Sequence, residues 1–162
     1  MIEDILNKLP NCYIFGSYIY KYKLNGEKYN DIDIIVPYTD VEITSKILEN
    51  IYNCVTMKKW LSYDKEYVKL KCNFNNEEVE IDLYDDITMQ TIWNRDKNEY
   101  GKILYRDNKF YHLDCINRDN TISNSCDEKL KEIIKNIRLK KYKKWNNMRK
   151  KDKEYFKDWK IF

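Results

Sequence analysis

The chain has 162 residues, of which 43% are hydrophobic, so it has enough apolar side chains to bury the core of one domain. It contains no apolar run of the roughly 18 residues that a membrane-spanning helix requires. Its first residues, MIEDILNKLPN, lack the apolar core of a signal peptide. We therefore expect a cytoplasmic protein that does not bind a membrane.

The net charge is only +3, but the charges are unevenly distributed. Residues 1–126 carry 16 basic and 21 acidic side chains, whereas residues 127–162 carry 14 basic and 6 acidic ones. Such a basic segment has two interpretations: a solvated helix face, or a surface that binds the phosphates of a nucleic acid.

The five cysteines are scattered without a C-x-x-C pair, and the chain has one histidine, His112. This pattern predicts neither a disulfide framework nor a zinc site, and it fits a reducing, cytoplasmic setting. A metal site in this chain would have to use oxygen ligands, which suit a hard ion such as Mg²⁺.

The apolar spacing alternates between helical and extended periods along the chain. Helices are expected at residues 2–9, 18–24, 41–53, 87–94 and from Asp127 onward, and extended segments at 12–15, 31–36, 66–74, 79–85 and 101–114. The segments 66–74 and 79–85 are expected to form a hairpin, and 101–114 a second hairpin that turns at Asp107 and Asn108.

Asp31 and Asp33 lie two residues apart in a predicted strand, so their side chains point to the same face. Ile32, Ile34 and Val36 point the other way, into a core. Two adjacent carboxylates raise each other's pKa unless a cation lies between them, and a divalent metal is the usual partner. The D-x-D pattern alone is also found on the solvated face of ordinary edge strands.

Asp82 gives the pattern more weight because it lies mid-strand, on the polar face of VEIDLYDD. If its strand neighbours the D-x-D strand, three carboxylates surround one point and can hold two Mg²⁺ ions, as in two-metal phosphoryl transfer. Glu80, Asp85 and Asp86 compete for the third place. Asp82 ranks first because Asp85 and Asp86 fall at the strand end, where caps and solvated acids are common.

Gly16 and Ser17 lie between a predicted strand and a predicted short helix. A glycine there lets backbone N–H groups approach a ligand closely, and a helix start offers further N–H groups to phosphate. A Gly-Ser pair alone indicates only a turn. The informative feature is the order: strand, Gly-Ser, helix, D-x-D strand, helix, and then a hairpin that carries a third aspartate.

The strings FGSYIYKYKLNGEKYNDIDIIV and VEIDLYD together resemble the signature of the DNA polymerase beta-like nucleotidyltransferase superfamily, h-G-[GS]-x(n)-D-h-D-h with a distal h-D-h. The resemblance covers residues 11–86. It implies an α+β fold in which residues 1–86 form a palm core, a mixed β-sheet flanked by helices. Residues 87–162 would be an extension packed on that core, with a hairpin and a basic helix.

The resemblance also implies the roles of individual residues. Asp31, Asp33 and Asp82 would be the catalytic carboxylates and would bind two Mg²⁺ ions, or Mn²⁺ in their place. Asp82 would help to deprotonate the acceptor hydroxyl. Gly16 and Ser17 would hold the triphosphate of the nucleotide donor.

One departure from the superfamily pattern concerns an arginine that many members place soon after the Gly-Ser pair. In this chain YIYKYK offers only Lys21 and Lys23 as basic residues for nucleotide binding. A lysine meets phosphate as a point charge and cannot form the bidentate contact of an arginine. The subfamily therefore stays open.

The implied activity is transfer of a nucleoside monophosphate from an NTP or dNTP, ATP included, to an acceptor hydroxyl. The basic residues 129–160 favour a nucleic-acid 3′-end as acceptor, as for a minimal polymerase or terminal transferase. One alternative is transfer to a protein partner, as in antitoxin-type AMPylation, or to a small molecule, as in antibiotic-modifying enzymes. Another is a catalytically silent nucleotide-binding module.

Overall fold

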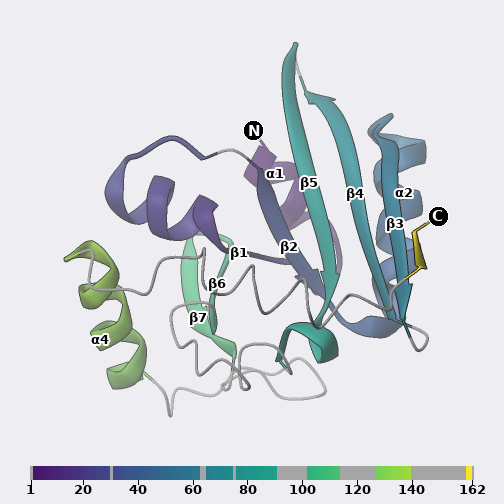
Figure 1. The fold of residues 1–162 in the computed structure, drawn as a ribbon. Coiled ribbons are helices and arrows are strands. Elements are labelled where there is room, and N and C mark those ends of the chain that lie inside the picture. Colours follow the sequence, from purple (N-terminus) through teal and green to yellow (C-terminus); the bar gives the residue numbers. More distant parts are fainter. Residues whose placement is uncertain are drawn as a thin grey trace.

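The computed structural model describes residues 2–29, 31–62, 65–74, 76–90, 102–113, 127–139 and 160–161. These residues form an α+β structure on one mixed eight-stranded sheet, in the order β7-β6-β1-β2-β5-β4-β3-β8 (Figure 1). The α+β class expected from the sequence is therefore confirmed. No helix in the described part of the chain is long and apolar enough to cross a membrane.

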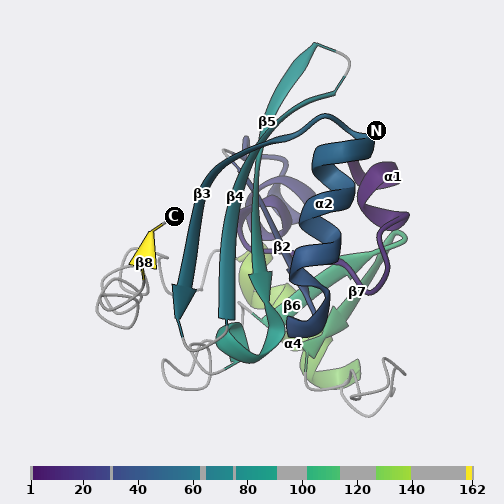
Figure 2. The same ribbon diagram turned by 90° about the vertical axis from the view of Figure 1, so that its right-hand side faces the viewer.

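Most expected elements are present, with slightly different bounds. The strands are β1 (Tyr13–Phe15), β2 (Ile32–Val36), β3 (Val55–Ser62), β4 (Lys65–Phe74), β5 (Glu77–Asp85), β6 (Ile103–Arg106), β7 (Lys109–His112) and β8 (Lys160–Ile161). The helices are α1 (Ile2–Asn7), the π-helical η1 (Tyr18–Lys23), the 3₁₀ turn η2 (Tyr38–Asp40), α2 (Val41–Ile51) and α4 (Asp127–Arg138). Residues 86–90 are also helical. Helices α1 and α2 lie on one side of the sheet (Figure 2).

The centre of the sheet joins the two segments that carry the acidic motifs. Strand β2 pairs in parallel with β5, and Asp33 is aligned with Asp82. Strand β1 pairs antiparallel with β2, and Phe15 is aligned with Asp33. The expectation that the two acidic strands are neighbours is confirmed. Ile34 and Leu83, also aligned, are fully buried and fix both strands in the core.

Both expected hairpins are present. Strands β4 and β5 pair antiparallel around a turn that includes Asn76. Strands β6 and β7 turn at Asp107 and Asn108, whose φ angles of 50° and 62° suit Asp and Asn better than most residues. Strand β6 pairs with β1 through Ile14 and Tyr105, so this hairpin continues the same sheet.

The local sequence pattern of residues 55–62 predicts no strand, yet β3 lies there and pairs antiparallel with β4. A disulfide links Cys54, just before β3, to Cys72 of β4, and their Cα atoms are 4.4 Å apart. The sequence pattern predicts no disulfide framework, and this pair is where the structure departs from that prediction. The pairing of Val55 with Lys71 places the two cysteines opposite each other, which spacing along the sequence does not reveal.

Arg106 of β6 connects the sheet to the end of α1. Its guanidinium donates hydrogen bonds to the backbone carbonyls of Asn7, Leu9 and Cys12, at 3.0, 2.9 and 2.8 Å. Carbonyls at and beyond a helix end have no donor within the helix, so the partly buried Arg106 guanidinium is a strong hydrogen-bond donor for them. Burial raises the pKa of the Cys12 thiol to about 12, despite the nearby Arg106 charge.

The helix expected from Asp127 onward is present as α4. Its apolar side is buried at Ile133 and Ile137, and its other side exposes basic residues. The side-chain amide of Asn25 donates to the carbonyl of Ile137 at 3.3 Å, so α4 ends against the loop between the Gly-Ser and D-x-D motifs. Of the expected basic segment beyond α4, residues 140–159 lie outside the described part of the chain.

Candidate metal centre

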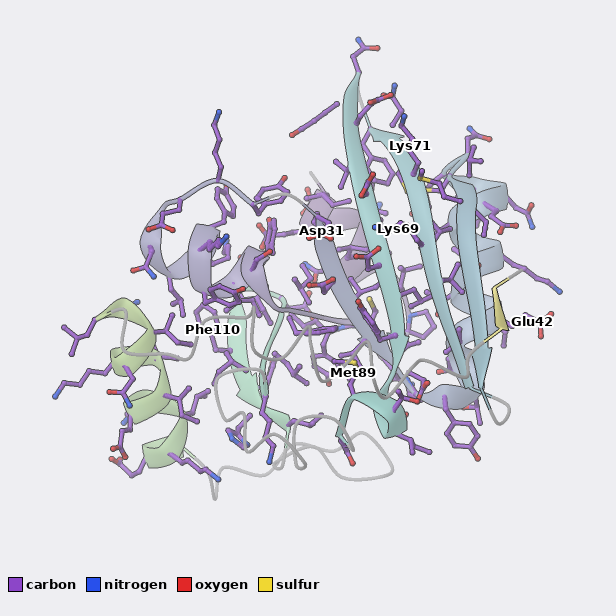
Figure 3. All side chains as sticks on the ribbon, in the orientation of Figure 1. Asp31, Glu42, Lys69, Lys71, Met89 and Phe110 are labelled. Carbon is purple, nitrogen blue, oxygen red and sulfur yellow. A yellow bond between two sulfur atoms is a disulfide. The ribbon has the colours of Figure 1, made fainter. Side chains whose placement is uncertain are left out.

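Three carboxylates from two adjacent strands meet at the centre of the sheet. Asp31 directly precedes β2, Asp33 lies within β2, and Asp82 lies within β5; one oxygen of each is within 4.8 Å of the others. The D-x-D spacing puts Asp31 and Asp33 on one face, and the register of β2 with β5 puts Asp82 beside them. The structure thus brings together the three acids predicted from the sequence. Asp31 lies just before the start of β2 (Figure 3).

The acids differ in exposure in a way that suits a site with one open side. Asp33 and Asp82 are 8% and 4% exposed, whereas Asp31 is half-buried. Carboxylates buried this closely together repel each other unless cations balance their charge. The strands therefore bury Asp33 and Asp82, while Asp31 brings the cluster to the protein surface.

The donor set fits Mg²⁺ or Mn²⁺. All three donors are carboxylate oxygens, the ligands that these hard ions prefer. Two oxygens on opposite sides of one Mg²⁺ are about 4.2 Å apart, given Mg–O distances of 2.0–2.1 Å. The three carboxylate oxygens lie within 4.8 Å of one another, which is close enough for them to share a metal site after at most small side-chain rotations.

Gly16 packs directly against this cluster. Its φ of 75° lies in the left-handed region, and a Cβ at this position would lie 2.5 Å from Asp33 Oδ2. Both features require glycine. The chain then enters η1 through Ser17, and the Gly16 carbonyl accepts hydrogen bonds from the N–H groups of Ile19 and Tyr20, at 3.0 and 3.2 Å. The start of η1, the predicted triphosphate site, therefore adjoins a predicted metal ligand.

Lys69 of β4 is a site residue that the motif alone does not identify. It is aligned with Asp82, and its ammonium lies 3.7 Å from Asp82 Oδ1 and 3.5 Å from Glu80 Oε2. Burial lowers its pKa, but the charges of Asp82, Glu80 and Asp31 outweigh burial and raise the pKa above its usual value. The alternation in EYVKLKCNF indicates a strand with Lys69 and Lys71 on one face. Because this strand is expected to pair with residues 79–85, that face can bring a lysine next to Asp82.

The two acids at the end of β5 serve local structure. Asp85 is buried and caps the following helical turn: its Oδ1 accepts the N–H of Thr88 and its Oδ2 the hydroxyl of Thr88, both at 2.7 Å. Asp86 Oδ1 accepts the N–H of Tyr38 at 2.9 Å, which ties the ends of β5 and β2 together. Burial raises the pKa of Asp86. These contacts agree with the sequence analysis, which prefers Asp82 to Asp85 and Asp86 as the third carboxylate of the site.

Of the two lysines expected near the nucleotide, Lys23 is engaged elsewhere on the described surface. Its ammonium lies 3.3 Å from Glu3 Oε2 and 4.8 Å from the centre of the Tyr105 ring. Lys23 would have to leave these partners to reach a phosphate. Lys21 is half-buried on η1. The assignment of both lysines to nucleotide binding stays a prediction.

Comparison of the sequence with protein-family models finds no match, and comparison with curated proteins finds none either. The sequence motif and the geometry of the acidic cluster are therefore the features that indicate a function for this chain.

Proposed function

We propose that this chain is a metal-dependent nucleotidyltransferase that transfers a nucleoside monophosphate from an NTP or dNTP to an acceptor hydroxyl. The observation that carries the proposal is the register of β2 and β5, which places Asp82 beside Asp33, with Asp31 two residues away. The contact between Gly16 and Asp33 adds support, because it joins the second half of the motif to the first.

Asp31, Asp33 and Asp82 would hold the ions, which when bound neutralise charge on the attacking oxygen and on the leaving pyrophosphate. The contribution of the chain is rigid placement. Phe15 is aligned with Asp33, and Tyr84 follows Asp82 on the same face of β5. Their rings pack edge to face at 5.4 Å and form an apolar layer next to the acids. Such a layer shields the two inner acids, Asp33 and Asp82, from water, and this strengthens the charge interactions of those two carboxylates.

In the proposed reaction the acceptor oxygen forms a bond to the α-phosphorus of the nucleotide. The bond from that phosphorus to the bridging oxygen of the leaving pyrophosphate breaks as the new bond forms. Asp82 receives the proton of the acceptor hydroxyl. Gly16 and Ser17 hold the triphosphate at the start of η1.

The acceptor that we favour is the 3′-end of a nucleic acid. Helix α4 exposes Lys129, Lys131, Lys135 and Arg138, and its last turn contacts the loop between the two motifs through Asn25. The exposed Arg138 therefore directly follows the residue of α4 that contacts this loop. Affinity for a labelled oligonucleotide should fall by about 1,000-fold between 50 and 200 mM salt, as for roughly six phosphate contacts. Affinity that does not change with salt would rule out this acceptor and leave the transferase proposal in place.

The test of the activity is incubation with each NTP and dNTP and Mg²⁺, with and without DNA or RNA oligonucleotides, read by mass shift. We expect the wild type to add a nucleotide and the Asp31→Asn/Asp33→Asn variant to add none. Asp85→Asn is the matched control, because it removes a carboxylate charge from the same sheet outside the cluster. Equal product from the wild type and the double variant, or none from the wild type, would contradict the proposal. A mass shift on a protein would identify a protein acceptor instead.

A further inference from the structure

We propose that Lys69 is a positioning residue that balances the charge of the acidic cluster before metal binds and that weakens the binding of a bare divalent ion. Ions would then enter the site together with the anionic nucleotide. This inference rests on the proposed function, because it assumes that Asp31, Asp33 and Asp82 form a metal site.

The placement of Lys69 follows from strand pairing. In the antiparallel pair β4–β5, Lys69 is aligned with Asp82, and its ammonium lies 3.5 Å from a Glu80 oxygen and 3.7 Å from an Asp82 oxygen. Figure 3 labels Lys69. The side chains of Lys69 and Asp82 are 25% and 5% exposed. Solvent and salt screen such a pair much less than they screen an exposed one. The ammonium is thus fixed close to a carboxylate that would bind metal.

A fixed positive charge at this distance has two consequences. Without metal it offsets repulsion among Asp31, Asp33, Asp82 and Glu80 and holds the Asp82 carboxylate in place. When a divalent ion binds to the same carboxylate, the ammonium repels it. A nucleotide triphosphate brings enough negative charge to offset both cations, so the complex of metal with nucleotide is favoured over the metal alone.

Lys71 forms an ordinary, solvent-exposed ion pair on the same strand and serves as a comparison for Lys69. It lies two residues along β4 on the same face, and its ammonium is 3.5 Å from Glu78 Oε1. The side chains of Lys71 and Glu78 are 49% and 68% exposed, so solvent screens this pair. Glu78 does not belong to the three-aspartate cluster. Lys71→Met therefore removes an identical charge from the same strand without touching the site.

The experiment measures Mn²⁺ binding to the full chain without nucleotide, by electron paramagnetic resonance. We expect Lys69→Met to bind Mn²⁺ on the order of tenfold more tightly than the wild type. Lys69→Arg, which keeps the charge, and Lys71→Met should stay within about twofold of the wild type. With nucleotide added, the wild type should approach the Mn²⁺ affinity of Lys69→Met, because the nucleotide supplies the balancing charge.

A second measurement separates this role from a purely structural one. In EDTA, Lys69→Met should unfold at a lower temperature than the wild type, because Asp82 loses its counter-charge. Added Mn²⁺ should raise the unfolding temperature of Lys69→Met more than that of the wild type, through its tighter binding. Lys69→Gln is the second variant, in case Lys69→Met does not fold.

The outcomes distinguish the two proposals. If Asp31→Asn/Asp33→Asn abolishes Mn²⁺ binding while Lys69→Met and Lys69→Gln bind it no more tightly than the wild type, the role of Lys69 is wrong and the metal site stands. If the wild type and the Lys69 variants bind no Mn²⁺, or if the double variant binds it unchanged, both proposals fail.

Discussion

The carboxylate of Asp33 occupies the space that a side chain at position 16 would need, since a Cβ on Gly16 would lie 2.5 Å from Asp33 Oδ2. Gly16→Ala must therefore displace Asp33 and also hold alanine at a φ of 75°, which costs about 1–2 kcal/mol on its own. We expect this variant to lose nucleotide transfer and to bind Mn²⁺ at least about tenfold more weakly, a loss of about 1.4 kcal/mol in binding.

Gly26 is the matched control for this prediction. It has a similar φ of 68°, but a Cβ there would meet nothing within 4 Å. Gly26→Ala should show the same backbone cost in urea unfolding, about 1–2 kcal/mol, while Mn²⁺ affinity stays unchanged. Equal effects of the two substitutions on Mn²⁺ binding would show that the contact between Gly16 and Asp33 does not matter to the site.

Thr88 tests whether Asp85 is a structural acid. The Thr88 hydroxyl donates to Asp85 Oδ2 at 2.7 Å, and both residues are buried. Thr88→Val keeps the shape but removes the donor, so the free energy of unfolding should fall by about 1–3 kcal/mol. Thr39→Val is the control, because Thr39 makes a similar bond to Asp40 on the exposed surface. Nucleotide transfer per folded molecule should be unchanged in both variants, and a selective loss in Thr88→Val would assign Asp85 to the site.

The sequence predicts the acidic site better than it predicts the rest of the sheet, and the reason is physical. Asp31, Asp33 and Asp82 stand within strong local alternation, so each strand and its polar face can be identified from neighbouring residues. Asp85 stands at a strand end, where a capping role is common, and its contacts agree with that. Lys69 becomes visible only when the register of β4 against β5 is known, because its partner is 13 positions away.

The disulfide and strand β3 are not predicted from the sequence, because both depend on pairing with β4. Residues 55–62 have weak alternation, so their extended form depends on pairing with β4. Cys54 and Cys72 become neighbours only through that pairing. The strand pairing and the disulfide are contacts between distant segments of the chain, and local periodicity carries no information about such contacts.

Arg106 should contribute strongly to stability, because it donates to three backbone carbonyls between the last residue of α1 and the start of β1. Arg106→Met fills similar space but leaves those carbonyls without their donor. We expect the free energy of unfolding in urea to fall by about 3 kcal/mol. Lys109→Met removes a positive charge from an exposed position at the other side of the same hairpin turn, and it should change stability by less than about 0.5 kcal/mol. Similar values for the two variants would contradict the capping role of Arg106.

The Cys54–Cys72 disulfide should stabilise the sheet, because it closes a loop in the unfolded chain with a sequence separation of 18. Loop closure of this size is worth about 3 kcal/mol. Urea unfolding with and without a reducing agent measures this difference in the wild type. The Cys54→Ala/Cys72→Ala variant is the control and should not respond to the reducing agent. A wild type that is equally insensitive would mean that the bond contributes nothing to stability.

The Glu3 carboxyl should make the stability of the protein depend on pH in the acidic range. Burial raises its pKa, but the neighbouring Tyr18, Tyr105 and Lys23 side chains lower it by more, so the pKa of Glu3 in the folded protein is below its usual value. The folded state therefore binds this proton less readily than the unfolded state. The resulting stability is present above the unfolded pKa and is lost as the pH falls through the folded pKa.

Glu3→Gln keeps the shape of the side chain and removes its charge and its titration. Urea unfolding of both proteins between about pH 6 and pH 3 should show the wild type more stable at the upper end and the difference shrinking toward the lower end. Glu42→Gln is the control, because Glu42 forms an exposed ion pair with Lys46 on α2 and should give a small difference throughout. A difference between the wild type and Glu3→Gln that stays constant with pH would show that the contacts of Glu3 do not favour its charged form. In that case its bond with Tyr18, at 2.8 Å, would act through geometry alone.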